Sequence, residues 1–245
     1  EMCDSDWSSD VCSSDLRRTS LARRWRAERA PITVMYDLGP RFTETSVEPG
    51  ANLLLRGPPL TGKRQLATEI LAAGAATTEG MVVVSTRHSA ERIRTDYRTL
   101  FDEPAIDTVG IVDAVTRHRG HAVEPDDYTK YVSSPRDLTE LGVKFAEFVR
   151  SYYVEGRVER MCAFLDSLTT LLLYTTLQTV FRFTHVFASR VENADALGLY
   201  TIESTVHDGE TLDALTKLFD GTITVDDAGT ATLSGAAFDD RTVDL

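Results

Sequence analysis

Two hydrophobic patterns alternate along this chain. Short, continuous apolar runs are typical of strands buried on both faces of a sheet. They occur at Leu53–Leu55, Met81–Val84, Thr108–Val112, Met161–Leu165 and Leu199–Ser204. Between these runs, apolar residues recur every three or four positions, which predicts amphipathic helices. Those helices are expected at Lys63–Ala76, Ala90–Phe101, Pro135–Val154, Leu168–Val186 and Glu210–Phe219. This alternation predicts an α/β fold, with a mostly parallel sheet and helices on both faces.

The end of the chain has a different pattern. Gly221–Val225 and Thr230–Leu233 are two short apolar segments joined by Asp-Asp-Ala-Gly, which predicts a C-terminal β-hairpin. Pro125–Pro135 is polar and is expected to be a loop. The most apolar stretch, Leu168–Phe181, stops at Arg182 and is too short to span a bilayer, so we expect a core helix and no membrane partner.

The first 34 residues differ from the rest in composition. Asp6–Leu16 resembles the in-frame translation of a sequencing adapter, so we exclude residues 1–16 from fold reasoning. Residues 17–34 contain six Arg and one Glu. They are either a basic arm or, the interpretation we favour, a non-native or disordered segment before a start at Met35. Residues 35–245 are then expected to form a single domain of the size that buries a full core.

Charge and cysteine content narrow the possible partners. The net charge is −12, and the opposite charges of residues 1–16 and 17–34 cancel, so the remainder of the chain is strongly acidic. Broad nucleic-acid binding needs a cationic face, so we do not expect nucleic acid to be a partner. Cys3 and Cys12 fall in the adapter-like segment. Cys162 lies in an apolar run and is expected to be a buried thiol, which fits a reducing cytoplasm.

The segment Gly57-Pro58-Pro59-Leu60-Thr61-Gly62-Lys63 has the spacing G-x-x-x-x-G-K. An apolar strand precedes it and a helical pattern follows, which is the context of a phosphate-binding P-loop. Glycines let the backbone N–H groups point at phosphate oxygens, and the helix N-terminus adds partial positive charge. We expect Gly57, Pro58, Thr61, Gly62 and Lys63 to contact the phosphates.

One position in this motif departs from the usual pattern. The residue after Lys63 is normally Ser or Thr, whose hydroxyl binds Mg²⁺. Here it is Arg64, which has five donors and no acceptor. Arg64 could add a contact to phosphate but could not hold the cation, so Mg²⁺ binding is in doubt.

A second acidic position could complete the site. Asp166 follows the apolar run Met161–Leu165, and an acid at the end of a second strand holds Mg²⁺ or its water in P-loop enzymes. The alternative is that Asp166 or Ser167 caps the next helix. With a P-loop already in the chain, we favour Asp166 as a possible metal ligand.

The order of P-loop, strand, long helix and Phe-Leu-Asp-Ser-Leu-Thr-Thr-Leu-Leu at 164–172 resembles the RecA/KaiC-like ATPase core. More narrowly, the chain is similar to shortened KaiC-like proteins of haloarchaea. The resemblance covers Tyr36–Val225 and implies a RecA-like P-loop NTPase fold. It also implies a glutamate just after the second strand that positions the attacking water. Here that strand leads into Ser85-Thr86-Arg87-His88, and Glu91 on the following helix is a poor substitute.

These features predict a nucleotide-binding regulatory protein that binds ATP or ADP, with weak or lost hydrolysis and no catalytic residue assigned. The nucleotide would control its conformation, its self-association as a homo-oligomer or its binding to a signalling partner. One alternative is an active Mg²⁺-dependent ATPase whose acid comes from elsewhere. Another is a scaffold that binds proteins and no nucleotide. Weaker candidates are His118 and His121 in a polar loop, Asp208 as a helix cap, and Arg190 as either a trans-acting finger or a surface residue.

Overall fold

The computed structural model describes residues 35–43, 45–75, 79–101, 109–154 and 158–245. The interpretations of residues 1–16 and 17–34 lie outside these residues. Contacts group Val34–Leu245 into one unit, and it is described here by itself.

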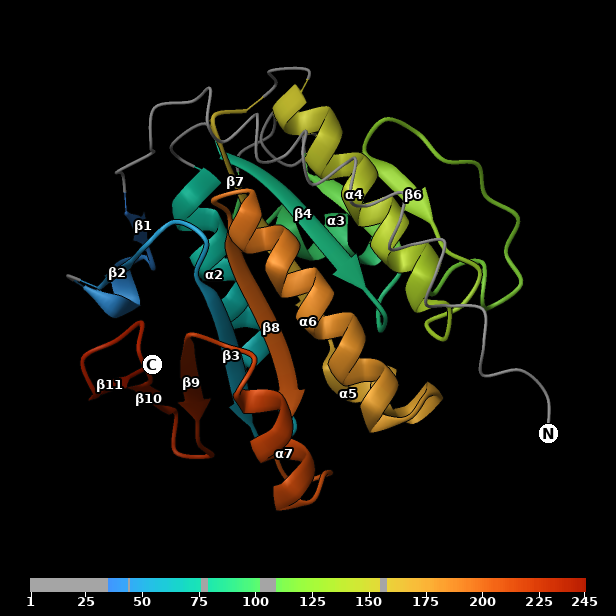
Figure 1. Cartoon of the computed structure of the whole chain (residues 1–245). Coiled ribbons are helices and arrows are strands. Elements are labelled where there is room, and N and C mark those ends of the chain that lie inside the picture. Colours follow the sequence, from blue (N-terminus) through green and yellow to red (C-terminus); the bar gives the residue numbers. More distant parts are fainter. Residues whose placement is uncertain (1–34, 44, 76–78, 102–108, 155–157) are drawn as a thin grey trace. The chain divides into compact units, whose positions relative to one another are not determined.

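A nine-stranded sheet in the order β11-β10-β9-β3-β8-β7-β4-β5-β6 forms the centre of this unit (Figure 1). Its strands are β3 (Asn52–Gly57), β4 (Glu79–Ser85), β5 (Gly110–Asp113), β6 (Thr129–Tyr131), β7 (Arg160–Asp166), β8 (Leu197–Glu203), β9 (Gly221–Val225), β10 (Thr230–Ser234) and β11 (Arg241–Asp244). From β9 to β6 all neighbours pair in parallel, whereas β9, β10 and β11 pair antiparallel. The expected mostly parallel sheet and the C-terminal hairpin are confirmed.

Helices cover both faces of the sheet, as the sequence predicts (Figure 1). They are α2 (Lys63–Ala75), α3 (Ala90–Tyr97), α4 (Leu138–Val154), α5 (Leu168–Tyr174), α6 (Leu177–Asn193) and α7 (Gly209–Thr216). A short segment before β3 contains β1 (Tyr36–Asp37), the 3₁₀ helix η1 (Pro40–Phe42) and β2 (Ser46–Val47). β1 and β2 form a separate two-stranded sheet. No helix in the described part of the chain combines the length and apolarity needed to cross a bilayer.

The core has two sides because successive strand residues point to opposite faces. Leu53 and Leu55 of β3 join the apolar cluster that also contains residues of α2 and α3. Leu54 is equally buried but points to the other face, which α4 and α6 cover. Burial on both faces explains why these strands are continuous apolar runs.

Aromatic rings fill the second side of the core. Phe187 of α6 stacks on Phe145 of α4 with ring centroids 4.1 Å apart, and it meets Tyr200 of β8 edge-on at 5.9 Å. The buried Tyr200 hydroxyl donates to Asn52 Oδ1 at 2.7 Å, which links β8 to the start of β3. This packing fixes β8 next to β3, the strand that leads into the P-loop.

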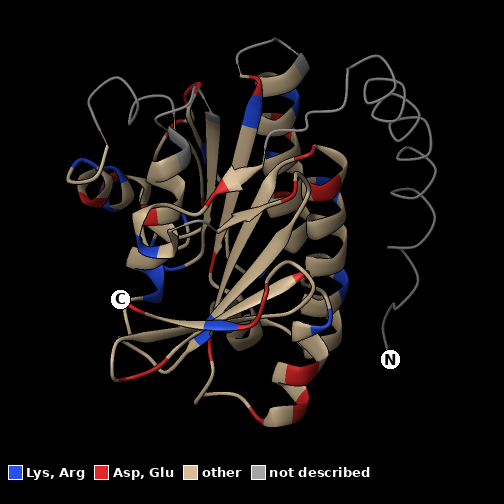
Figure 2. Ribbon diagram, turned by 90° about the vertical axis from the view of Figure 1, so that its left-hand side faces the viewer, with Lys and Arg blue, Asp and Glu red and all other residues tan. Residues whose placement is uncertain are grey.

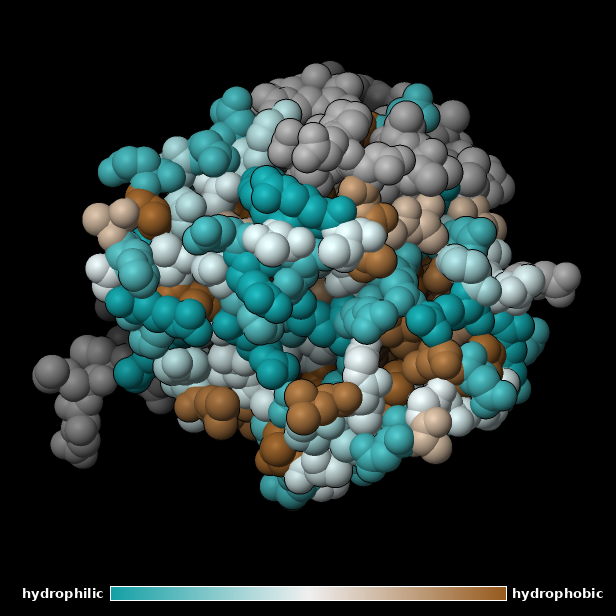
Figure 3. Space-filling model, turned by 180° about the vertical axis from the view of Figure 1, so that it is seen from behind, coloured by the Kyte–Doolittle hydropathy of each residue, from teal (hydrophilic) through white to brown (hydrophobic). Residues whose placement is uncertain are grey.

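Solvent-facing positions are mostly polar. The molecule seen from behind is largely hydrophilic, with scattered apolar patches (Figure 3). In the view of Figure 2, acidic and basic residues are interspersed along the ribbon. The whole sequence has 38 Asp and Glu against 26 Lys and Arg.

Several predicted elements need correction. The segment Leu168–Val186, expected as one helix, is divided into α5 and α6. Thr175 is extended, with φ −151°, and the Thr176 side chain accepts the N–H of Thr179, so a new helix begins there. Pro125–Pro135, expected as a loop, contains β6, which pairs with β5. β1, β2 and β11 were not predicted, and Thr108 lies outside the described residues.

We predict that Phe187→Ala lowers the free energy of unfolding by about 3–5 kcal/mol, because it leaves a cavity between α4, α6 and β8. Urea denaturation followed by circular dichroism measures this change. Leu173→Ala, at a side chain that is 77% exposed on α5, is the control and should change stability by less than about 0.5 kcal/mol. Equal effects of the two substitutions would contradict this account of the core.

Candidate nucleotide-binding site

The segment Gly57–Lys63, predicted to be a P-loop and given that name below, connects the carboxyl end of β3 to the start of α2. β3 ends at Gly57 and α2 begins at Lys63, with five residues between them. Gly62 has φ +81°, a left-handed conformation that favours glycine. At Gly57, a Cβ would lie 2.2 Å from the Val225 carbonyl oxygen of β9, so no side chain fits there. Both glycines of the motif are therefore required by the backbone path.

Lys63 lies inside this loop. Its side chain is only 6% exposed, and Nζ donates to the Pro58 carbonyl oxygen and to Thr61 Oγ1. Thr61 Oγ1 in turn donates to the Pro58 carbonyl oxygen at 3.0 Å. Burial lowers the pKa of Lys63, and the nearby Glu203 carboxylate opposes that effect. Both hydrogen-bond acceptors are neutral, so the positive charge of Lys63 can act on an anionic ligand.

Arg64, the first residue after the P-loop lysine, forms two ion pairs. Its Nε lies 3.2 Å from Asp166 Oδ2, and its Nη1 lies 2.9 Å from Asp96 Oδ2 on α3. Arg92 Nε also contacts Asp96 at 2.9 Å. The Asp166 side chain is 2% exposed, and its other oxygen accepts from Thr201 Oγ1 of β8 at 3.2 Å. The structure thus brings Arg64 and Asp166 together, but as a pair with each other.

The residues here do not suit a Mg²⁺ ion. In P-loop NTPases the cation is held by the hydroxyl after the P-loop lysine and by the acid at the end of a second strand. At these two positions the chain has Arg64 and Asp166, and Arg64 Nε lies 3.2 Å from Asp166 Oδ2. Within the described ranges, no group of three or more His, Cys, Asp or Glu could hold a metal ion. Asp166 therefore acts here as the counter-ion of Arg64.

At the end of β4, the chain has an arginine near the expected place of a water-positioning acid. Thr86 is fixed to the β7–α5 turn: its N–H and Oγ1 donate to the Asp166 carbonyl oxygen at 2.8 and 3.0 Å, and its Oγ1 accepts the Ser167 N–H at 2.9 Å. Arg87 Nη1 then pairs with Glu203 Oε1 at 2.9 Å. Glu91 is exposed on α3 and takes no part in this arrangement.

Glu203 was missed by the sequence analysis. It is the last residue of β8 and lies in register with Gly57, next to the P-loop. An acid at the end of an apolar strand is the same signal that identified Asp166. The expected strand ran past Glu203 to Ser204, and Asp208 was the acid singled out after it.

The weaker candidates have structural roles. Ser167 accepts the Thr170 N–H and caps α5, the role considered as an alternative for this position. Asp208 accepts the Thr211 N–H at 2.7 Å and caps α7. Arg190 Nη1 donates to the Gly142 carbonyl oxygen on α4 at 2.7 Å. Cys162 is buried in β7, as expected.

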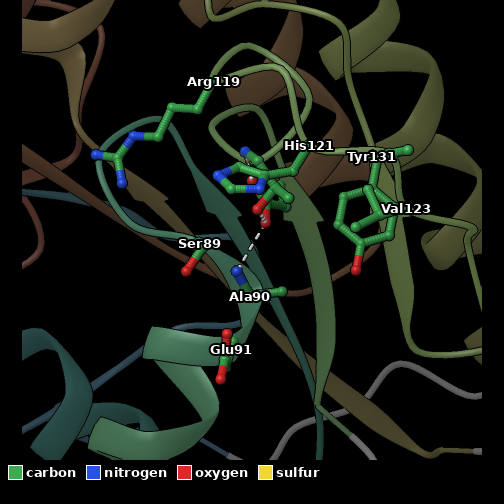
Figure 4. Close-up of a pocket in the computed structure, with 10 residues that line it drawn as sticks. Ser89, Ala90, Glu91, Arg119, His121, Val123 and Tyr131 are labelled. Atoms are coloured by element: carbon green, nitrogen blue, oxygen red, sulfur yellow. Dashed lines mark hydrogen bonds between the residues drawn. The ribbon is translucent and has the colours of Figure 1, made fainter.

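A separate cavity of about 340 Å³ lies at the carboxyl end of β5 (Figure 4). Arg119 and His121 of the polar loop line it together with Ser89 and Glu91. The buried acid in its lining, Asp113, accepts the Ala90 N–H at 2.7 Å. It also accepts the N–H groups of Val115 and Thr116 and the Thr116 hydroxyl. This carboxylate is engaged in holding the start of α3. Three strands separate β5 from β3, so this cavity is distinct from the P-loop.

We predict that Arg64→Ala lowers the free energy of unfolding by about 1–3 kcal/mol, because it leaves the buried Asp166 charge without its partner. Urea denaturation at neutral pH measures the loss. Arg41→Ala removes an exposed ion pair with Glu69 and should cost at most about 1 kcal/mol. If the two variants are equally stable, the Arg64–Asp166 pair has no special structural role.

Comparisons with known proteins agree with this fold. The structure is similar to that of a KaiC-like protein, PH0186, from the hyperthermophilic archaeon Pyrococcus horikoshii OT3, with TM-score 0.60 and 13% identity over 87% of this chain and 94% of that one. It is also similar to an uncharacterised protein, PH0321, from Pyrococcus horikoshii in complex with an unknown peptide, with TM-score 0.58 and 14% identity over 78% and 92% of the two chains. At these identities the likeness concerns the fold alone. No curated protein matches the chain. A family profile matches residues 50–225, and the chain belongs to this family of unknown function, DUF7504.

Proposed function

We propose that this protein binds a nucleotide, ATP or ADP, through Gly57, Pro58, Thr61, Gly62 and Lys63, and that it regulates a partner without rapid hydrolysis. The observation that carries the proposal is the buried Lys63, held within a strand–loop–helix P-loop by neutral oxygens only. The KaiC-like fold is consistent with such a site. The assignment to a haloarchaeal branch remains a prediction from the resemblance.

The Arg64–Asp166 pair supports binding that does not need Mg²⁺. A guanidinium is always charged and can donate to phosphate while it remains near a carboxylate. In the proposed site, the Arg64 guanidinium would take the role of the divalent cation, so the positive charge next to the β-phosphate would be part of the protein. Without Mg²⁺ and with Arg87 near the place of the expected acid, two of the main contributions to phosphoryl transfer are missing.

Arg64 also offers a route from the ligand to the rest of the molecule. It connects α2 to α3 through Asp96 and to β7 through Asp166. A phosphate that attracts Arg64 would weaken its hold on Asp96 and allow α3 to move. The partner that responds would be a second copy of the chain or a signalling protein. PH0321 was crystallised with an unknown peptide. We therefore propose that the part of the partner recognised by this protein is a peptide segment.

The first test is calorimetric titration of the full chain with ATP and with ADP, each with Mg²⁺ and with EDTA, in high salt. We expect binding that Mg²⁺ changes by less than about twofold. Lys63→Ala should weaken it about 10- to 100-fold, as for the loss of a charge-assisted hydrogen bond. Lys217→Ala, at an exposed position after α7, is the matched control and should bind normally.

Three results would contradict parts of this proposal. No binding of either nucleotide would favour the scaffold alternative. Binding that persists in Lys63→Ala would place the nucleotide elsewhere. Mg²⁺-dependent phosphate release that Lys63→Ala abolishes would favour an active ATPase, with Glu203 as the acid from another strand.

A second test restores the missing hydroxyl. In Arg64→Thr the Thr hydroxyl and the freed Asp166 would form the usual pair of cation ligands. We expect nucleotide binding by this variant to weaken in EDTA and to recover with Mg²⁺, by about tenfold or more, whereas the wild-type affinity stays level. Calorimetry under the same conditions measures both. Equal Mg²⁺ responses of the variant and the wild type would show that Arg64 does not replace the cation.

A further inference from the structure

The Arg87–Glu203 ion pair crosses the carboxyl end of β7. Arg87 follows β4 and Glu203 ends β8, and these two strands lie on either side of β7 in the sheet. The bridge from Nη1 to Oε1, at 2.9 Å, therefore spans the position where β7 ends in Asp166.

Both ends of this bridge are fixed to the same turn. Thr86, next to Arg87, is bonded to the Asp166 carbonyl oxygen and the Ser167 N–H. The Glu203 N–H donates to Thr169 Oγ1 at 2.9 Å. The Glu203 side chain is 16% exposed, so its carboxylate cannot move far into solvent. Glu203 is therefore held at the edge of the sheet, whereas the Arg87 side chain is 41% exposed and can move into solvent.

The bridge lies next to the phosphate end of the P-loop. Glu203 is in register with Gly57, and the Ser204 N–H donates to the Gly57 carbonyl oxygen at 2.8 Å. Among charged side chains, Glu203 and then Arg87 have the largest effects on the pKa of Lys63, ahead of Asp166. The lysine of a P-loop reaches the β- and γ-phosphates. A third phosphate would therefore meet this bridge.

From this arrangement, and resting on the proposed function, we propose that the Arg87–Glu203 pair makes the site select a nucleoside diphosphate over a triphosphate. A γ-phosphate brings additional negative charge toward the Glu203 carboxylate. No Mg²⁺ neutralises it, and in the proposed site Arg64 serves the β-phosphate while it stays paired with Asp166. The third phosphate must draw Arg87 away from Glu203 or accept like-charge repulsion in a partly buried site. A diphosphate, whose last phosphate lies at Lys63, neither breaks the Arg87–Glu203 ion pair nor meets the repulsion of Glu203.

The discriminating variant is Glu203→Gln, which keeps the side-chain shape and the backbone bond to Thr169 while removing the charge. Calorimetry of the full chain with ADP and ATP in EDTA should show tighter ADP binding by the wild type. Glu203→Gln should raise ATP affinity about tenfold and change ADP affinity by less than about twofold. Arg87→Gln leaves the Glu203 charge without its partner and should widen the preference for ADP. Glu147→Gln, in an exposed ion pair on α4, is the control and should leave the ratio unchanged.

Other outcomes would overturn the inference. If the wild type binds ATP as tightly as ADP, or if Glu203→Gln leaves the ratio unchanged, the pair does not select the ligand, although the proposed function stands as long as Lys63→Ala weakens both. If the wild type releases phosphate from ATP and the Glu203→Gln variant does not, Glu203 is the water-positioning acid of an ATPase instead. If neither nucleotide binds to the wild type, the proposed function fails together with this inference.

Discussion

The ion pair between Arg64 and Asp166 determines how the rest of this site can work. In most P-loop proteins a Mg²⁺ ion from solution supplies the second positive charge next to the lysine. Here the Arg64 guanidinium, in the first turn of α2, supplies a positive charge near Asp166. A guanidinium stays protonated under all physiological conditions and presents its donors in a fixed plane. Under the proposed function, ligand binding would then be independent of the divalent cation concentration. A guanidinium provides neither the octahedral coordination nor the activated water of a bound metal ion.

The sheet order brings the charged residues of the site together. β3, β8, β7 and β4 are neighbours, so Lys63, Glu203, Asp166 and Arg87 meet at one edge although they come from distant parts of the sequence. Each acid at this edge has a basic partner, because Glu203 pairs with Arg87 and Asp166 pairs with Arg64. Arg64 also pairs with Asp96 on α3. Charges in one such network do not act independently, so a substitution at one position changes the others. Under the proposed function, this coupling would connect a bound phosphate to α3 and to the end of β8.

Local patterns in the sequence predicted much of this structure. The apolar runs located the central parallel strands, and the spacing of Gly57, Gly62 and Lys63 predicted the loop between β3 and α2. The role of Arg64 could be predicted only as a missing hydroxyl, because its partner Asp166 is 102 residues away and the pairing depends on the strand order. Glu203 was not predicted because the expected strand ran to Ser204, which hid the fact that an acid ends β8. The break between α5 and α6 depends on the Thr176 side chain, which caps a new helix. Such side-chain bonds to the backbone compete with a continuous helix, and the apolar periodicity does not show them.

The environment of Lys63 bears on whether the fold has kept a ligand. A buried ammonium loses hydration, and the neutral oxygens of Pro58 and Thr61 replace that loss only in part. A scaffold without a ligand would be more stable with an apolar side chain of similar size at this position. The arrangement is favourable once an anion shares the loop, because the attraction then acts where water is excluded. Ligand binding and folding stability are therefore linked through this one residue, since any nucleotide that binds the native loop must raise the free energy of unfolding. Under the proposed function, the buried charge destabilises the free protein, and a bound nucleotide would offset that loss.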